Sequence, residues 1–300
     1  MHLQALVNEA PDQRPETIAV AQAADDDVLR AVIQATQHNM AQFCLVGSVE
    51  EIKQRIAHLG GQTEHYTYVE ARSEREACER AVQQVADGQA KALMKGLVST
   101  STLLKAVLNK EKGLRTQQLI SHVAAFEVPG YDRLILVTDA AMNINPDLKE
   151  KAKIIENAVS VAHALGLNQP KVAPVCPVEV VNPAMQSTVD AATLSMMNQR
   201  GQIQGCTVDG PLALDNAVSQ DAARHKGIQS EVAGKADILL VPTIEVGNTL
   251  YKSLVYFARA KVGALVVGAK APIILTSRAD SDEAKLYSIA LAAHYAAFHS

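Results

Sequence analysis

The feature that most constrains the fold of this chain is a regular alternation of short β-rich runs with longer helical patterns. The runs lie at 17–23, 42–47, 65–71 and 91–96. The segments between them carry apolar residues near i, i+3, i+4 and i+7, which is the spacing of one face of a helix. Strands and helices that alternate at this spacing predict βαβ units and a mainly parallel sheet.

The rhythm changes near the middle of the chain. Two β-rich runs, 118–128 and 132–139, are separated only by Pro129-Gly130-Tyr131. This connection is too short for a crossover helix and predicts a hairpin, which is a plausible domain boundary. Helical and strand patterns then alternate again. The sequence therefore predicts an α/β protein of two lobes with mainly parallel sheets, crossed by the chain more than once, and a cleft between the lobes.

Composition narrows the function classes. The 300 residues are 48% hydrophobic and 20% charged, which is typical of a folded protein with a substantial core. A net charge of −4 gives no support to nucleic-acid binding. The 4 cysteines form no CxxC pair, so we expect neither a disulfide framework nor a metal site. No signal-peptide pattern or membrane-spanning apolar run is present, and we expect a cytoplasmic protein.

The stretch from Ala271 to Lys285 gathers the most reactive side chains. It reads as a buried strand, a polar turn and an amphipathic helix. Ligands of open α/β sheets bind at such turns, because backbone N–H groups and the helix dipole favour anions. The turn holds a hydroxyl (Ser277), a guanidinium (Arg278) and several carboxylates, as a reaction centre would.

A capped helix is the competing interpretation of the same turn. Asp280 would be the N-cap, Glu283 its N3 partner, and Asp282 an acid favoured by the helix dipole. Arg278 speaks against this interpretation, because a cation near a helix N-terminus is locally unfavourable unless an anion lies beside it.

Five further polar clusters follow predicted strands, at the edge where α/β proteins build their sites. The lysine of Met94-Lys95-Gly96, followed by the hydroxyls of Ser99 to Thr102, suits phosphate binding. A surface lysine followed by an ordinary Ser/Thr N-cap explains the same residues equally well. For the others, helix caps and turns are competing explanations. These four other clusters are Thr138 to Asn145 with Asp139 and Asn143, Met185 to Thr188 with Ser187, Asp209-Gly210-Pro211 with Asp215, and Glu245 to Lys252.

The last of these clusters is the most suggestive. Asn248 and Lys252 stand at i and i+4 and so share one face near the expected start of a helix at 247–261. Common nucleotide-binding, P-loop, zinc-protease and serine-hydrolase motifs are absent from the sequence. The sequence pairs no base with Cys176, so we expect this cysteine to be a small buried residue rather than a nucleophile.

Taken together, these clusters resemble the phosphate acetyl/butyryltransferase family, and within it the butyryl branch. The resemblance covers nearly the whole chain. GN-x-x-YK and the final Ser-Arg are shared with the acetyl branch, whereas MKGLVST, PVCPVEVVN and LTSRADS are similar to the butyryl branch. The segments that carry it are 94–116, 121–143, 172–192, 205–219, 233–242, 247–252 and 271–281.

The resemblance implies a two-domain α/β fold related to the isocitrate/isopropylmalate dehydrogenase type, with the site in the interdomain cleft. It places the closing strand and helix in the first domain. We therefore predict a discontinuous domain of residues 1–130 plus 272–300 and a second domain of residues 131–271. The implied substrates are acyl-CoA and phosphate, with no metal or other cofactor, and the implied assembly is a homo-oligomer of even number.

The resemblance also implies roles for particular residues. Ser277 would hydrogen-bond the CoA sulfur or the developing oxyanion, and its use as a nucleophile stays open. Arg278 would hold phosphate bidentately. The acid of the acetyl branch lies one position beyond Glu283, where this chain has Ala284, so either Asp282 or Glu283 would be the general base. Substrate-binding residues would be Lys95, Thr100, Asn143, Ser187, Asn248 and Lys252.

Reversible transfer of a short acyl group, preferably butyryl, between CoA and phosphate is the activity that the resemblance implies. Phosphate acetyltransfer by the same chemistry is the nearest alternative, because one methylene gives only ~1–3 kcal/mol of discrimination. A binding protein for CoA or phosphate esters, without catalysis, is another. A metal- and NAD-dependent dehydrogenase on the same fold is disfavoured, since no closely spaced aspartates share one predicted helix.

Overall fold

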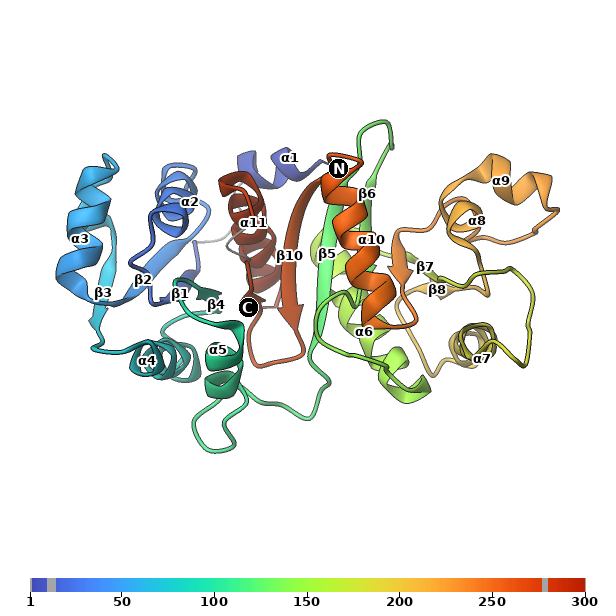
Figure 1. Cartoon of the computed structure of the whole chain (residues 1–300), viewed down its shortest axis with the longest axis horizontal. Coiled ribbons are helices and arrows are strands. Elements are labelled where there is room, and N and C mark those ends of the chain that lie inside the picture. The colour runs from blue at the N-terminus through green and yellow to red at the C-terminus, as the bar shows by residue number, and fades with distance from the viewer. Residues whose placement is uncertain (1, 10–14, 277–279, 300) are drawn as a thin grey trace. The chain divides into compact units, whose positions relative to one another are not determined.

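The computed structural model describes residues 2–9, 15–276 and 280–299 of the chain (Figure 1). Its contacts divide the chain into two compact units. One, the discontinuous unit, comprises residues 2–118 and 262–300; the other, the continuous unit, comprises residues 119–261. The predicted class, mixed α/β with mostly parallel strands, is confirmed in each unit. The predicted domain limits at 130/131 and 271/272 stay a prediction.

The sheet of the discontinuous unit has the order β3-β2-β1-β4-β11-β10. Only the β10–β11 pair is antiparallel among the described pairs of this unit. The strands are β1 (Thr17–Ala21), β2 (Gln42–Gly47), β3 (Thr67–Glu70), β4 (Ala92–Lys95), β10 (Lys261–Val267) and β11 (Ile273–Ile274). Each predicted run of the first lobe therefore forms a strand, although several strands are one or two residues shorter at an end than predicted.

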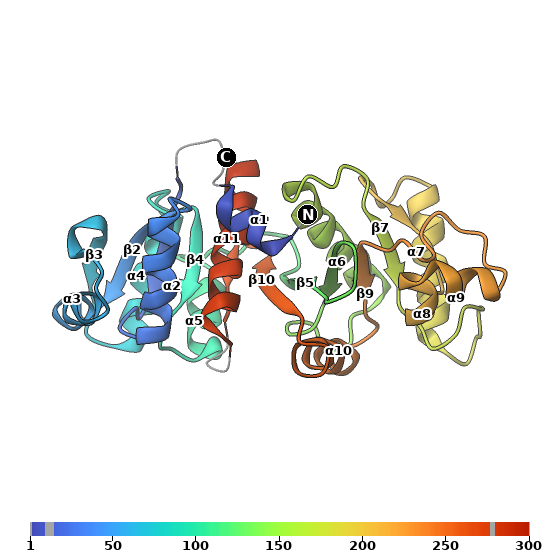
Figure 2. The same cartoon turned by 90° about the horizontal axis from the view of Figure 1, so that it is seen from above.

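Two groups of helices flank this sheet. In the first, α11 (Asp282–Phe298) packs against α1 (Leu3–Asn8) and α2 (Asp26–Gln37). In the second, α4 (Glu74–Ala86) packs against α5 (Thr100–Val107) and against β1 and β2, as Figures 1 and 2 show. The remaining elements are α3 (Val49–His58) and a short 3-10 turn, η1 (Thr63–His65).

The closing helix differs from its prediction. We expected α11 to be amphipathic, but an unbroken run of its residues, Ala284 to Ala293, is buried. A helix that is apolar all round is stable only when it is covered on all sides. The neighbours α1, α2, β4 and β11 supply this cover, and a single sequence gives no sign of such neighbours.

The continuous unit has the sheet order β5-β6-β9-β7-β8. Strands β5 (Ser121–Glu127) and β6 (Leu134–Thr138) are antiparallel, which confirms the predicted hairpin. The other described pairs are parallel. The remaining strands are β7 (Lys171–Pro174), β8 (Thr207–Val208) and β9 (Ile238–Leu240).

Local capping explains where the main helix of this unit begins. Asp147 accepts a hydrogen bond from the Glu150 N–H, and the Glu150 carboxylate accepts one from the Asp147 N–H, so α6 (Leu148–Ala164) starts with a capping box. The one helix predicted around 214–225 is two short ones, α8 and α9. The other helices are α7 (Gln186–Gln199), α8 (Leu214–Val218), α9 (Gln220–His225) and α10 (Ile244–Tyr256).

A buried ion pair joins α6 to α7. Lys151 Nζ lies 2.6 Å from Asp190 Oδ2, and the two side chains are 7% and 10% exposed. Gln186 Nε2 donates a second hydrogen bond to the same carboxylate at 2.8 Å. Each charge thus compensates the other, which burial requires.

Removal of one partner should therefore be costly. We expect Lys151→Met to lower the free energy of unfolding by roughly 3–5 kcal/mol, because Asp190 would remain as an uncompensated buried charge. The matched control is Arg75→Met, which breaks a solvent-exposed pair with Glu79 and should leave the free energy of unfolding nearly unchanged. Denaturant unfolding measures both. If the two variants lost the same free energy of unfolding, Lys151–Asp190 would contribute no more than an exposed pair, which would contradict its stabilising role as a buried ion pair.

Candidate active site

The strand register of the discontinuous unit brings two predicted clusters to one edge of its sheet. Lys95, the last residue of β4, pairs with Ala21 of β1. On the other side of β4, Ile274 of β11 pairs with Met94. Because these strands are parallel, the residues that follow them leave the sheet at the same edge. The loop after Lys95 and the segment that begins at Thr276 are therefore neighbours.

Lys95 is buried at this edge, with 6% of its surface exposed. Its ammonium group donates to the backbone carbonyls of Gly96 and Val98, each at 3.2 Å. Gly96 is required by the close approach of β4 to β1, because a Cβ there would lie 2.2 Å from the Gln22 carbonyl oxygen. The Lys-Gly pair thus combines a buried cation with a backbone contact that only glycine permits.

A pocket of about 170 Å³ opens beside Lys95. Thr276, which is 5% exposed, contributes to its wall, as does Lys285 of α11, which is 3% exposed. The other lining residues are Asp25, Asp27, Val28, Gly96 and Leu97. The predicted catalytic residues Ser277 and Arg278 lie outside the described residues.

The start of α11 differs from the predicted cap. Ser281, not Asp280, is the N-cap, and its Oγ accepts a hydrogen bond from the Ala284 N–H at 3.1 Å. Glu283 is therefore not the N3 residue, and the expected Asp280–Glu283 cap was wrong by one position. A serine accepts this bond as well as an aspartate does, so sequence could not choose between the two neighbours.

The two candidate bases occupy different surroundings on α11. Glu283 accepts a hydrogen bond from the Tyr287 hydroxyl at 2.6 Å, and the same hydroxyl lies 3.3 Å from Gln4 Oε1 of α1. Asp282, half-buried, has no hydrogen-bond or ion-pair partner within the described parts of the chain. Neither residue contributes to the wall of the Lys95 pocket.

Thr100 is exposed as the first residue of α5 and lies outside the Lys95 pocket. The helix is capped by Ser99, whose Oγ accepts from the Thr102 N–H at 3.1 Å, as the competing N-cap interpretation expected. Ser99 Oγ also lies 2.9 Å from Ser101 Oγ and 2.8 Å from Thr102 Oγ1. The hydroxyls of this cluster thus bond largely to one another.

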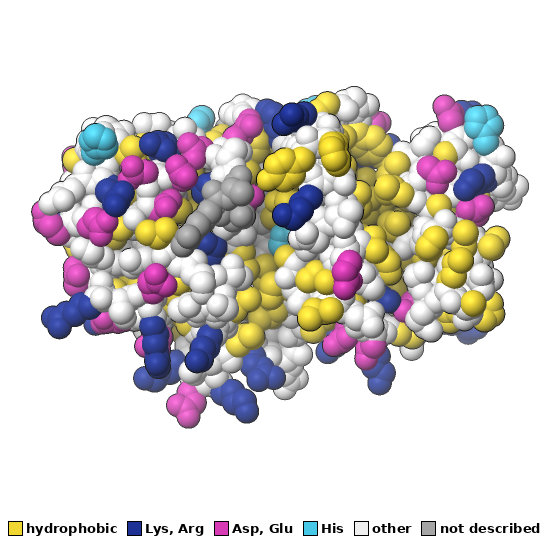
Figure 3. All heavy atoms as spheres, viewed as in Figure 1, with side chains coloured by type: hydrophobic (Ala, Val, Ile, Leu, Met, Phe, Trp, Pro, Cys, Tyr) yellow, Lys and Arg dark blue, Asp and Glu magenta, His cyan; other side chains and the backbone are white. Residues whose placement is uncertain are grey.

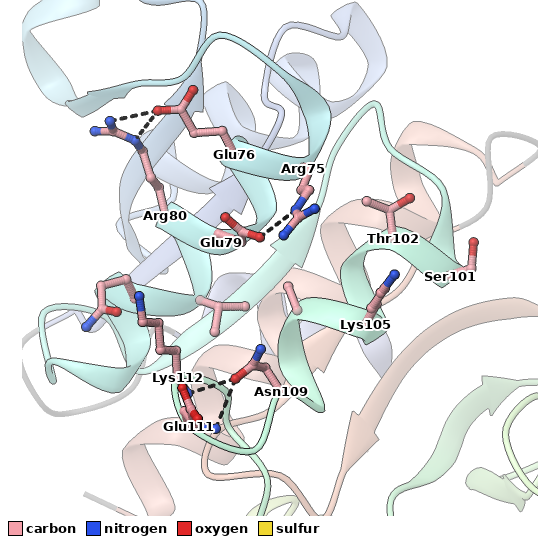
Figure 4. A pocket seen from close by; sticks show the side chains of 13 residues that line it. Arg75, Glu76, Glu79, Arg80, Ser101, Thr102, Lys105, Asn109, Glu111 and Lys112 are labelled. Carbon is pink, nitrogen blue, oxygen red and sulfur yellow. Dashed lines mark hydrogen bonds and ion pairs between the residues drawn. The ribbon is translucent and has the colours of Figure 1, made fainter.

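A larger groove of about 830 Å³ runs between α4 and α5 (Figure 4). Its arginines are already paired along α4, Arg75 with Glu79 and Arg80 with Glu76. Lys105 and Lys112 add positive charge and Glu111 negative charge. The described lining of the groove contains none of the predicted site residues, whereas the Lys95 pocket contains Lys95 and Thr276, the residue before Ser277. We therefore place the candidate site at the Lys95 pocket despite its smaller volume.

In the continuous unit, the predicted residues Asp139 and Asn143 organise the loop after β6. The buried Asp139 carboxylate accepts hydrogen bonds from the backbone N–H groups of Ala141 (2.8 Å), Met142 (2.9 Å) and Asn143 (3.2 Å). Asn143 Nδ2 donates to Asp139 Oδ2 at 2.6 Å and to the Ile120 carbonyl at 2.9 Å. Both amide hydrogens of Asn143 thus hold the loop.

The GN-x-x-YK segment lies on α10, which begins three residues earlier than expected. Its N-cap is Thr243, and the hydrogen bond of the Thr243 side chain to exposed Glu245 lowers the pKa of that carboxyl group. Asn248 and Lys252 are exposed and lie in the second and third turns rather than at the helix start. The expectation that these two residues stand at the helix opening is therefore wrong, whereas their binding of a ligand stays a prediction.

Gly247 and Tyr251 of the same segment have structural roles. A Cβ on Gly247 would lie 2.5 Å from the Asp139 carbonyl oxygen and 2.9 Å from Ala140 Cα. Tyr251 packs its ring edge-on against Phe126, with 5.2 Å between the centroids. These contacts fix α10 on the loop after β6 and on β5, and Asn248 and Lys252 remain exposed.

Ser187 is the second residue of α7 rather than its cap, which was the simpler expectation. The N-cap is Met185, without a side-chain bond. The turn is held instead by Thr188, whose hydroxyl donates to the Asn182 and Met185 carbonyls and accepts from the Asn182 N–H. Cys176 is 5% exposed, and burial raises the pKa of its thiol, as expected of a buried residue rather than a nucleophile.

Within the described residues, the structure thus gathers Lys95, Thr276 and Lys285 in one unit. In the other unit, Gly247 of α10 packs against the loop that Asp139 and Asn143 hold. Sequence reasoning missed Lys285, because a lysine within a helix is ordinarily a solvated residue. The same residues hold no group of three or more His, Cys, Asp or Glu side chains suited to a metal ion. Their helices include none long and apolar enough to span a membrane.

The packing of Gly247 makes a direct prediction. We expect Gly247→Ala to lower the free energy of unfolding by about 1–3 kcal/mol, since its Cβ meets backbone atoms that cannot rotate away. Thr249→Ala, an exposed neighbour on α10, is the control and should stay within about 0.5 kcal/mol of the wild type. Denaturant unfolding is the measurement. A fully stable Gly247→Ala variant would show that α10 does not depend on this contact.

Comparisons with known proteins agree along almost the whole chain. The family model for phosphate acetyl/butaryl transferase matches residues 2–83 and 67–293. A phosphate butyryltransferase of Clostridium beijerinckii is 53% identical over 97% of this chain and 95% of its own length. A phosphate acetyltransferase of Thermotoga maritima is 47% identical over 99% of this chain and 100% of its own length.

Solved structures agree with the sequence comparisons. The crystal structure of a branched-chain phosphotransacylase from Enterococcus faecalis superposes with a TM-score of 0.84 and 39% identity. The match covers 94% of this chain and 99% of that one. The resemblance recognised in the sequence is thereby confirmed: this chain belongs to the phosphate acetyl/butaryl transferase family.

Proposed function

We propose that this chain is an acyltransferase that moves a short-chain acyl group reversibly between CoA and inorganic phosphate. The preferred reaction is butanoyl-CoA + phosphate = butanoyl phosphate + CoA. The observation that carries the proposal is the 53% identity to a phosphate butyryltransferase over 97% of the chain. The 47% identity to a phosphate acetyltransferase supports the same chemistry with acetyl as the alternative.

The reaction joins two anionic substrates at one carbonyl carbon. A phosphate oxygen attacks the thioester carbonyl, an O–C bond forms, and the C–S bond breaks. The sulfur leaves as a thiolate and takes up a proton to give CoA. Catalysis then depends on positioning and on neutralisation of charge, and we propose direct transfer with no metal, no other cofactor and no acyl-enzyme.

The proposed roles follow the charges of the side chains. Arg278 holds phosphate bidentately, and Ser277 hydrogen-bonds the CoA sulfur or the oxyanion. Buried Lys95 supplies positive charge at the end of β4. The proposed substrate-binding set is completed by Thr100, Asn143, Ser187, Asn248 and Lys252.

For the reverse reaction, a carboxylate must take the proton of the CoA thiol. Glu283 already accepts a hydrogen bond from Tyr287 at 2.6 Å, so one of its oxygens is engaged. Asp282 has no such partner within the described residues. We therefore favour Asp282 as the general base and keep Glu283 as the alternative.

We also propose a cytoplasmic homo-oligomer of even number, on a fold related to isocitrate/isopropylmalate dehydrogenase. Exposed apolar side chains on and next to α10 support association. Phe257 is 88% exposed, Tyr256 56% and Val246 42%, and hydrophobic side chains gather at the surface around this helix in Figure 3. Surface patches of this kind commonly mark protein–protein contacts.

The proposed function is tested by thiol release from acetyl-, propionyl-, butyryl- and valeryl-CoA, with and without phosphate. We expect release that requires phosphate and is fastest with butyryl-CoA, because the acyl site would be fitted to four carbons. A thiol reagent monitors the reaction. A maximum at acetyl would keep the chemistry and change the substrate, and no phosphate-dependent release from any thioester would leave a binding protein.

The choice of base is tested by two variants that remove one carboxylate charge each. We expect Asp282→Asn to lower kcat for acyl transfer from acyl phosphate to CoA by roughly 10²–10⁴-fold, the usual contribution of a general base. Glu283→Gln is the matched control and should retain most of the activity. The reverse order would assign the role to Glu283, and two fully active variants would exclude both residues.

A further inference from the structure

Lys285 of α11 is buried where a lysine is physically unexpected. It lies in the first turns of the helix, four residues after the N-cap Ser281, and is 3% exposed. A cation near a helix N-terminus is disfavoured by the dipole. Burial adds a second cost, because charged side chains are rarely buried unless they are paired.

The partners of Lys285 compensate only part of this cost. Its Nζ donates one hydrogen bond, to the Asp280 carbonyl oxygen at 2.6 Å. An ammonium group has three hydrogen-bond donors, and Lys285 has no ion pair with any described residue. By contrast, Lys151, the buried lysine of the other unit, is paired with a carboxylate at 2.6 Å.

Lys285 shares its pocket with a second buried cation. Lys95, which is 6% exposed, lines the same cavity of about 170 Å³ from the end of β4. At ~30 Å³ per water molecule in the liquid, this space holds several waters, and so has room for a phosphate group. Thr276 adds a hydroxyl to the wall.

Two carboxylates also line the pocket, but both have other partners. Asp25 is the N-cap of α2, and its Oδ1 accepts from the Val28 N–H at 3.0 Å. Asp27 Oδ1 forms an ion pair with Arg30 Nη1 at 3.0 Å. Neither carboxylate forms an ion pair with Lys285, so the positive charge of Lys285 can attract an incoming anion.

We propose that Lys285 is a further phosphate-binding residue, which acts together with Lys95 on a phosphate or phosphate-ester group in this pocket. The identity of the ligand rests on the proposed function, which offers two sources of the same chemistry. One is inorganic phosphate, the reacting group, and the other is a phosphate group of CoA. Both present several anionic oxygens to which ammonium groups donate strong hydrogen bonds.

The test is calorimetric titration of the unliganded protein with inorganic phosphate alone and with CoA alone. Lys285→Met should bind one of these ligands roughly 10- to 100-fold more weakly than the wild type, the usual loss for a hydrogen bond to a charged group. Lys285→Arg keeps the charge and should recover part of the affinity. Lys91→Met is the matched control, since Lys91 is exposed directly before β4, at the end of that strand opposite to Lys95.

Thermal unfolding without ligand separates this role from a structural one. If Lys285 served only to bond the Asp280 carbonyl, its replacement would lower Tm. We expect Tm of Lys285→Met to be unchanged or raised, because an uncompensated buried charge is removed. Should this variant not fold, Lys285→Gln, which retains a hydrogen-bond donor without the charge, takes its place in the titrations.

The results of these experiments distinguish inorganic phosphate from CoA as the source of the bound phosphate group. They also test the phosphate pocket separately from the proposed function. A loss confined to phosphate assigns the pocket to inorganic phosphate, and a loss confined to CoA assigns it to a CoA phosphate. Unaltered binding of both ligands by Lys285→Met, or no binding of either ligand by the wild type, overturns the inference. Weakened binding in a protein whose wild type turns over no acyl-CoA would refute the proposed function and leave the phosphate pocket standing.

Discussion

The burial of two ammonium groups at one edge of a sheet is the constraint on which the candidate site depends. Lys95 and Lys285 come from a strand and a helix far apart in the sequence and line the same small pocket. Backbone carbonyls accept hydrogen bonds from both. Lys285 has no ion pair with a described residue, and a carbonyl dipole offsets a buried charge less than an opposite charge does, so Lys285 favours an anion in the pocket.

The surrounding packing keeps these groups in place. Gly96 lets β4 approach β1 closely, and Ser281 fixes the start of α11. The continuous unit shows the contrasting case, in which buried Lys151 has a carboxylate partner and no ligand is needed. A buried lysine thus stabilises the packing of the continuous unit and, on our account, binds an anion in the discontinuous unit.

The sequence predicted the strands and the hairpin well, because their apolar patterns are local and strong. It failed where two neighbouring residues could serve equally, as with Asp280 and Ser281 at the cap of α11. It also failed where tertiary contacts decide the outcome. The helix α10 starts at Ile244, with Thr243 as its N-cap, whereas Gly247, which seemed to open the helix, is needed to pack against the loop after β6.

The candidate site was only partly predictable for the same reason. Lys95 stood out because Lys-Gly followed a strand and preceded a run of hydroxyls. Lys285 gave no local sign, since its burial comes from the cover of α11 by α1, α2 and the sheet. Asn143 holds a loop with both its amide hydrogens, which its sequence neighbours did not indicate, and its binding of substrate stays a prediction. The proposed roles of Ser277 and Arg278 rest on the family resemblance.

The central claim is that buried lysines at the ends of β4 and α11 bind phosphate oxygens. A crystal structure of the full chain grown with inorganic phosphate and CoA tests it most directly. Our account predicts phosphate oxygens at about 2.7–3.2 Å from the Nζ atoms of Lys95 and Lys285. Bound ligands whose phosphate groups all lie away from this pocket, with only water beside the two lysines, would contradict it.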